Sequence, residues 1–394
     1  MQQIIHAQIK TMDHHAYPDG YVLWEDGVIH AVGPMTELTE IDPNALDAEG
    51  ALLLPGFIDA HCHIGMWEDG LGFEGDDGNE DTEPVTPQLR AIDAVNPLDR
   101  CFTEALESGI TTVVTGPGSA NPIGGSWLAM KTDGRRIDEM LVKEPVGMKF
   151  ALGENPKSSY HTKDSGPATR MATAALIREQ LYKAKRYLAD KQLHENQPDE
   201  YDAPEYDIRC EALIPVLTRQ VKAFFHAHRA DDIFTALRLS REFHLDCVIV
   251  HGTDGHLVAD ILAKEGAQVI TGPLLCDRSK PELRELTPRN PAALSAAGVK
   301  VAICTDHPVI PIQYLRLSAA LAVAEGLDTD MALRAITIDA AKICGLDDRI
   351  GSITVGKEAD FVLFARDDDP LSFQVKPQAV FVRGRLAAER GRRV

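Results

Sequence analysis

The sequence predicts an α/β protein, a (β/α)8 barrel with a small β-sandwich domain built from both ends of the chain. From residue 55 to 349, short apolar runs alternate with helical patterns, as the parallel strands of a barrel require. Residues 1–54 and 350–394 contain short alternating runs between turn residues, which are typical of an antiparallel sheet. Because either end would be marginal as an isolated sheet, two independent β-tails are disfavoured.

The composition fits a water-soluble protein with a large core. The chain has 394 residues, of which 44% are hydrophobic, and a formal net charge of −20. This charge argues against nucleic acid or an anionic membrane as partner. There is no apolar run of eighteen residues and no evident secretory signal, so we expect no membrane span. The seven cysteines are scattered, which indicates reduced thiols in the cytoplasm. We expect a small-molecule substrate and a homo-oligomer.

The expected elements follow in chain order. The end domain should contain strands at 3–9, 20–24, 27–32, 359–364 and 378–384. The barrel strands should begin at 57 and then lie at 109–115, 125–131, 147–152, 221–225, 246–250, 268–270 and 299–304. Helices are expected at 168–191, 231–243, 257–264, 291–297, 314–325 and 329–344. The acidic, glycine-rich segment 67–83 follows the first barrel strand and is expected to be a solvated loop, with a lid over the site as the alternative.

Residues that commonly bind metal ions follow several of these strands. His61 and His63 stand two positions apart, so a strand would direct both imidazoles to the same side. His226, His251 and Asp306 each follow another apolar run. Because the carboxyl ends of parallel barrel strands meet at one face, these side chains are expected to converge there.

The segment that carries the first two histidines reads PGFIDAHCH, from Pro55 to His63. Together with His226, His251 and Asp306 in order, it resembles the metal-dependent amidohydrolase superfamily, and most of all its imidazolonepropionase-like branch, over nearly the whole chain. The resemblance implies that the two chain ends join in one β-sandwich beside the barrel. It also implies two tasks for Asp306, metal contact and proton transfer from water to the leaving group.

Nitrogen and oxygen ligands of this kind suit zinc, while manganese, iron or nickel are possible. The resemblance assigns His61, His63, His226, His251 and Asp306 to one or two divalent ions. A second ion would need a bridging anion, which relatives supply as a glutamate or a carboxylated lysine. Glu154 at a strand end and Lys149 five residues earlier are the alternatives. We favour Glu154, because ligands gather at the carboxyl ends of barrel strands.

Four further residues are candidates for substrate binding: His228, Arg229, His256 and His307. Deaminases of the superfamily resemble one another in a glutamate three residues after the fifth-strand histidine, and here that position is Arg229. An arginine could hold a substrate carboxylate, or pair with Asp231 or Asp232. We therefore expect a hydrolase of C–N bonds in amides, cyclic amides or peptide-like compounds. A heterocycle deaminase and a catalytically silent scaffold protein are the alternatives.

Overall fold

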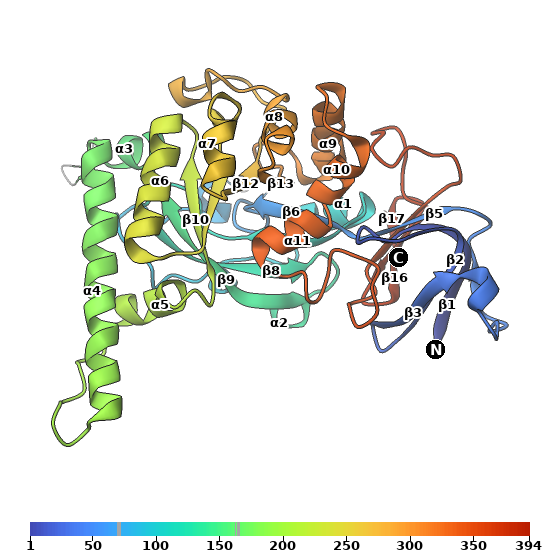
Figure 1. Cartoon of the computed structure of the whole chain (residues 1–394), viewed down its shortest axis with the longest axis horizontal. Coiled ribbons are helices and arrows are strands. Elements are labelled where there is room, and N and C mark those ends of the chain that lie inside the picture. Colours follow the sequence, from blue (N-terminus) through green and yellow to red (C-terminus); the bar gives the residue numbers. More distant parts are fainter. Residues whose placement is uncertain (69–71, 162, 164–165) are drawn as a thin grey trace.

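A computed structural model describes residues 1–68, 72–161, 163 and 166–394 of the chain. The sheet built from the chain ends lies at one end of the molecule, the barrel in the middle and the long helix α4 (Arg170–Asn196) at the far end (Figure 1). Part of the predicted acidic loop, residues 69–71, lies outside the described residues. None of the described helices is both long and apolar enough to cross a membrane.

Eight strands of the described chain form one sheet that curls into a nearly closed barrel. In order they are β6 (Phe57–Cys62), β7 (Ile110–Thr115), β8 (Ile123–Lys131), β9 (Leu141–Ala151), β10 (Lys222–Ala227), β11 (Cys247–His251), β12 (Gln268–Thr271) and β13 (Lys300–Ile303). The predicted barrel is confirmed, with one difference. Strand β8 runs antiparallel to both β7 and β9, while the other neighbouring pairs are parallel.

The chain ends form a second sheet, as predicted, although its first strand pairs in parallel with two of the others and the sheet is therefore not purely antiparallel. It contains β1 (Gln2–Lys10), β2 (Ala16–Glu25), β3 (Val28–Pro34), β4 (Leu46–Asp47), β5 (Leu52–Pro55), β14 (Phe361–Phe364), β15 (Ala379–Val382), β16 (Arg385–Glu389) and β17 (Arg392–Arg393). The Trp24 ring on β2 lies 5.9 Å from the Phe381 ring on β15. These strands are four places apart, or about 19 Å in a flat sheet. The sheet therefore bends back on itself around a shared apolar core.

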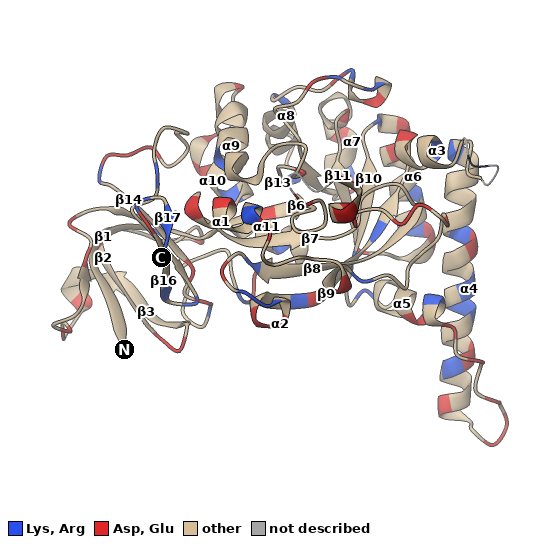
Figure 2. Ribbon diagram, turned by 180° about the vertical axis from the view of Figure 1, so that it is seen from behind, with Lys and Arg blue, Asp and Glu red and all other residues tan. Residues whose placement is uncertain are grey.

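Helices cover the outside of the barrel. The larger ones are α1 (Arg100–Glu107), α3 (Glu154–His161), α4, α5 (Ile208–Leu217), α6 (Ala230–Phe243), α7 (Ala259–Lys264), α8 (Asn290–Ala296), α9 (Leu315–Ala324), α10 (Thr329–Ala335) and α11 (Ile338–Cys344), and α2 (Ile137–Met140) is a single turn. The helix expected at 329–344 is thus two helices, because the backbone at Thr337 leaves the helical region. Helix α4 carries both signs of charge along its length (Figure 2), which fits its exposure to solvent.

A buried ion cluster joins the barrel to the end sheet. Lys131, at the end of β8, is fully buried, and its Nζ atom lies 2.8 Å from Glu358 and contacts Asp360 more closely. It also donates to the Thr112 hydroxyl at 3.2 Å. A lysine can be buried in this way only when carboxylates and hydrogen bonds replace its hydration. This cluster therefore fixes the sheet against the barrel.

We predict that Lys131→Met destabilises the protein by about 3–5 kcal/mol, because it leaves two carboxylates without their buried counter-charge. Thermal and urea unfolding followed by circular dichroism will measure the change. Lys264→Met is the matched control, since its exposed pair with Asp260 should contribute less than about 1 kcal/mol. Equal unfolding midpoints for the two variants would contradict the role given to the cluster.

Candidate metal centre and active site

The first and last barrel strands, β6 and β13, lie next to each other and bring His61, His63 and Asp306 together. Asp59 on β6 accepts hydrogen bonds from the backbone and the hydroxyl of Thr305, just after β13. The Asp306 backbone N–H donates to the His61 carbonyl at 3.1 Å. As a result, the Asp306 Oδ1 atom lies 3.2 Å from His61 Nε2 and 3.4 Å from His63 Nε2.

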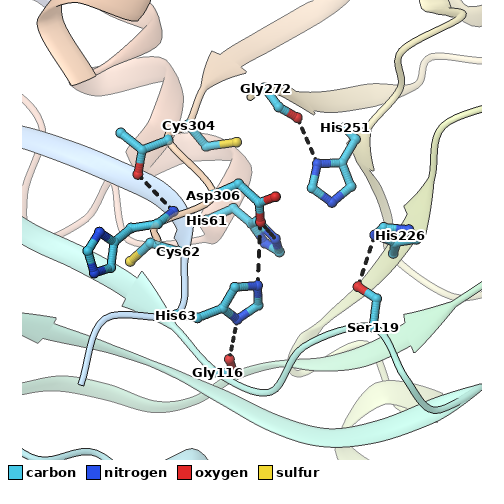
Figure 3. A network of polar contacts seen from close by, with 12 residues as sticks. His61, Cys62, His63, Gly116, Ser119, His226, His251, Gly272, Cys304 and Asp306 are labelled. Atoms are coloured by element: carbon cyan, nitrogen blue, oxygen red, sulfur yellow. Dashed lines mark hydrogen bonds and ion pairs between the residues drawn. The ribbon is translucent and has the colours of Figure 1, made fainter. Parts of the chain in front are cut away.

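Three of the histidines, His63, His226 and His251, are each oriented by a contact at their Nδ1 atom (Figure 3). His251 Nδ1 donates to the Gly272 carbonyl at 2.7 Å, and His63 Nδ1 donates to the Gly116 carbonyl at 2.7 Å. His226 Nδ1 shares a hydrogen bond of 2.9 Å with the Ser119 hydroxyl. Such contacts fix the tautomer and direct the Nε2 lone pair inward, as in histidines that bind metal ions.

The ligand-type atoms form two groups that share His251, and each group could hold an ion. Those of His61, His251 and Asp306 lie within 4.8 Å of one another, and so do those of His226, His228 and His251. Burial, followed by nearby positive charge from Lys149, holds the pKa of His61 well below its usual value. Burial is also the main reason that the pKa of His251 falls to about 4. The imidazoles are therefore neutral near pH 7, which is the form that binds metal.

Two of these residues have unusual backbone conformations. His251 has φ of 75° and Asp306 has φ of 56°, in the left-handed region that costs a non-glycine residue free energy. Both stand just where a barrel strand ends, so the turn aims each side chain into the barrel mouth. Burial alone would raise the pKa of Asp306, but His251 and the contacts from His61 and His63 hold it well below its usual range.

Lys149 lies near this cluster and interacts electrostatically with His61 and His251, whereas Glu154 is not among the residues that line the cavity of the cluster. Lys149 on β9 is fully buried, and its Nζ atom has no hydrogen-bond partner among the described residues. Burial lowers its pKa to about 7. Glu154 follows Gly153, where φ is +86°, and begins α3. Its side chain lines a neighbouring pocket of about 620 Å³, because the turn at Gly153 carries it away from the barrel mouth.

The ligand cluster opens into a cavity of about 370 Å³, which the sequence-predicted His228 also lines. His228 Nδ1 contacts the Thr253 hydroxyl at 2.7 Å. Two residues of the segment after β12, Lys280 and Glu282, were not predicted. Glu282 Oε1 lies 3.6 Å from His228 Nε2 and 2.7 Å from Lys280 Nζ. The feature of the sequence that could have identified them as site residues is their position after a barrel strand.

The other three substrate-binding candidates are not among the residues that line this cavity. Arg229 pairs with Asp231 at 2.9 Å and borders the neighbouring pocket, so of the two roles considered for it the structure shows the salt bridge. His256 contacts the Thr253 carbonyl at 3.2 Å. The Nδ1 atom of His307 accepts a hydrogen bond from the Ile312 backbone. These contacts position loops around the site.

Comparison with known proteins agrees with this architecture. A model of the Amidohydrolase family matches residues 220–387. The crystal structure of an amidohydrolase from Thermotoga maritima MSB8 is 39% identical, covers 99% of this chain and 100% of its own, and superposes with a TM-score of 0.93. The chain belongs to the amidohydrolase family.

Two further relatives of this amidohydrolase span most of its length. Amidohydrolase tasK of Hapsidospora irregularis is 30% identical over 391 residues, which are 93% of this chain. The chain covers only 39% of the length of that relative. The imidazolonepropionase of Pseudomonas putida is 26% identical, with 91% of each chain covered.

The residues of this amidohydrolase fit a divalent metal ion. The buried His226 Nε2 atom has no hydrogen-bond partner among the described residues. An unpaired buried nitrogen is costly, and a bound ion would accept its lone pair. His61, His63, His226, His251 and Asp306 are the residues that would hold the ion, and Lys149 lies close enough to interact electrostatically with His61 and His226.

We predict that Ser119→Ala weakens metal binding by about 10- to 100-fold, because it removes the hydroxyl that orients His226. Titration against a chromophoric chelator will measure the affinity. Ser318→Ala is the control, since the buried Ser318 hydroxyl on helix α9 contacts only the carbonyl of Tyr314, the residue before that helix, among the contacts described. Unchanged affinity in Ser119→Ala would show that this contact does not orient a ligand.

Proposed function

We propose that this amidohydrolase hydrolyses a C–N bond of an amide, cyclic amide or peptide-like substrate with a metal-activated water. One observation carries the proposal: neutral imidazoles and a carboxylate converge, at the floor of a cavity, from four different strand ends. Structural ion pairs do not need this arrangement, whereas catalytic metal sites do. The retained ligand set also disfavours a catalytically silent scaffold.

A divalent ion bound here would acidify a coordinated water and polarise the bond under attack. Asp306 would accept the proton from that water, since its carboxylate is ionised and lies at the centre of the cluster. It would then deliver the proton to the departing nitrogen. The Nδ1 contacts of His63 and His251 keep the imidazoles fixed during this transfer.

Zinc is the ion that these nitrogen and oxygen donors suit best, with manganese, iron or nickel as alternatives. Lys149 supports a site for two ions. Its amine is buried among the histidines, and a neutral amine can add CO2 and release one proton to become a carbamate. The resulting carboxylate could bridge two cations, a role that we now assign to Lys149 in place of Glu154.

Deamination of a heterocycle is the second candidate function. The Glu282 carboxylate, close to His226 and His228, is the one observation that favours it. However, Glu282 is already engaged by Lys280 and by the Glu154 backbone N–H. Amide hydrolysis therefore remains the main proposal, and a screen that measures ammonia beside free amine separates the two reactions.

We predict that Asp306→Asn lowers kcat roughly 10²- to 10⁴-fold and changes KM far less, because the variant keeps the shape but cannot accept the proton. Steady-state kinetics on the metal-loaded protein will measure both constants. Asp246→Asn is the control, since Asp246 pairs with Lys222 at the opposite end of the barrel. Turnover near the parental value in Asp306→Asn would overturn the proton-transfer role.

We also predict that Lys149→Met lowers the bound metal from two equivalents to about one or fewer, because the bridging anion is lost. Glu154→Gln should leave the stoichiometry unchanged, since that side chain lines a different pocket. Elemental analysis after reconstitution with zinc and bicarbonate will give the metal content. The reverse result, with loss only in Glu154→Gln, would restore the glutamate as the bridging ligand.

A further inference from the structure

The segment after β12 places a fixed positive charge beside the ligand cluster. Lys280 Nζ lies 2.7 Å from Glu282 Oε1 and donates to Asn155 Oδ1 at 2.7 Å. Glu282 Oε2 in turn accepts a hydrogen bond of 3.0 Å from the Glu154 backbone. The ammonium group is therefore held from two sides, by a residue of its own segment and by one of α3.

Glu282 is only 1% exposed, and a buried carboxylate is costly unless it is paired. Lys280 is its ion-pair partner, but the lysine side chain is 29% exposed and lines the cavity. An ammonium group has three N–H donors, and Asn155 and Glu282 account for two of them. One donor is left for a molecule in the cavity, so the pair does more than stabilise the loop.

The remaining charges make this position distinctive. Among the described residues that line the cavity, Lys280 is the only lysine or arginine, whereas Asp277 and Asp306 are acidic. Lys280 is therefore the one side chain of the described lining that could offer an ammonium hydrogen-bond donor to an anionic group of a substrate.

We infer that Lys280, positioned by Glu282 and Asn155, binds a substrate carboxylate that lies close to the bond under attack. This inference rests on the proposed hydrolase function. One carboxylate group, that of Glu282, separates the Lys280 ammonium from His226 and His228. So short a separation suits an N-acyl α-amino acid or dipeptide, in which three bonds join the scissile carbonyl carbon to the carboxylate carbon.

The test measures binding of two non-hydrolysable probes, N-methylphosphonyl alanine and its C-terminal carboxamide, to the zinc-loaded protein by calorimetry. The two probes have nearly the same shape, but the carboxamide is neutral and has an NH2 group in place of one carboxylate oxygen. We expect the parent protein to bind the carboxylate probe about 10- to 100-fold more tightly, the range that one charged hydrogen bond supplies. Lys280→Met should abolish this preference, and Lys280→Arg should keep part of it.

Two further variants keep the test decisive. Lys280→Met alone leaves Glu282 without its counter-charge, so Lys280→Met with Glu282→Gln removes both charges and should lose the preference while folding normally. Lys222→Met, which breaks an ion pair at the opposite end of the barrel, should retain the parental preference. Unfolding midpoints of all variants will show which proteins are intact.

The inference is overturned if the parent protein binds the two probes equally or binds neither, or if the preference survives in the double variant. The hydrolase proposal fails by a separate result, in which the zinc-loaded protein prefers the carboxylate probe but hydrolyses no N-acyl amino acid and no neutral amide. In that case Lys280 still binds the carboxylate, and only the proposed reaction is wrong.

Discussion

The closure of the barrel between β6 and β13 is the constraint on which the site depends. These two strands are the edges of the described eight-stranded sheet, and Asp59 joins them through the Thr305 hydroxyl and backbone. Burial raises the pKa of Asp59 to about 7, against the effect of these donors. The hydrogen bonds from Thr305 and the His61 backbone offset part of the cost of burying this carboxyl group, and they hold the strand ends that carry His61 and Asp306 next to each other.

The lowered pKa values of His61 and Lys149 result from the exclusion of water from the barrel interior below the ligand cluster. The Trp127 ring stacks on the His61 imidazole at 4.4 Å between centroids, and Lys149 Nζ lies 4.9 Å from the same ring. Burial above this floor disfavours positive charge on His61 and Lys149 and lowers both pKa values, although the face of the Trp127 ring itself favours a cation at Lys149. The proposed metal binding and carbamate formation both depend on the uncharged forms of these groups.

Sequence alone could predict the barrel and the strand-end position of the histidines, because these follow from periodicity and from the shared face of parallel strands. The joining of the two chain ends in one sheet is implied by the family resemblance. The sequence could not predict the direction of β8, since an apolar run is the same in either direction. The rule that ligands gather at strand ends favours Glu154 over Lys149, whereas the turn at Gly153, after which Glu154 lines a neighbouring pocket, is not visible in the sequence pattern. Sequence alone also could not predict that the Lys280–Glu282 ion pair lies beside the ligand cluster, because tertiary contacts set the course of the loop that carries it.

The reversed strand β8 also links the two domains to the site. Because β8 runs antiparallel to its neighbours, it begins near the barrel mouth and ends at the opposite side, next to the end sheet. Trp127 lies midway along it and supports His61, while Lys131 at its end enters the ion cluster with Glu358 and Asp360. The sheet built from the chain ends thus anchors the strand that carries the floor of the site. Weaker packing of the end sheet would therefore change the position of His61 through β8. This coupling would be indirect, because no residue of the end sheet lines the cavity in the described part of the chain.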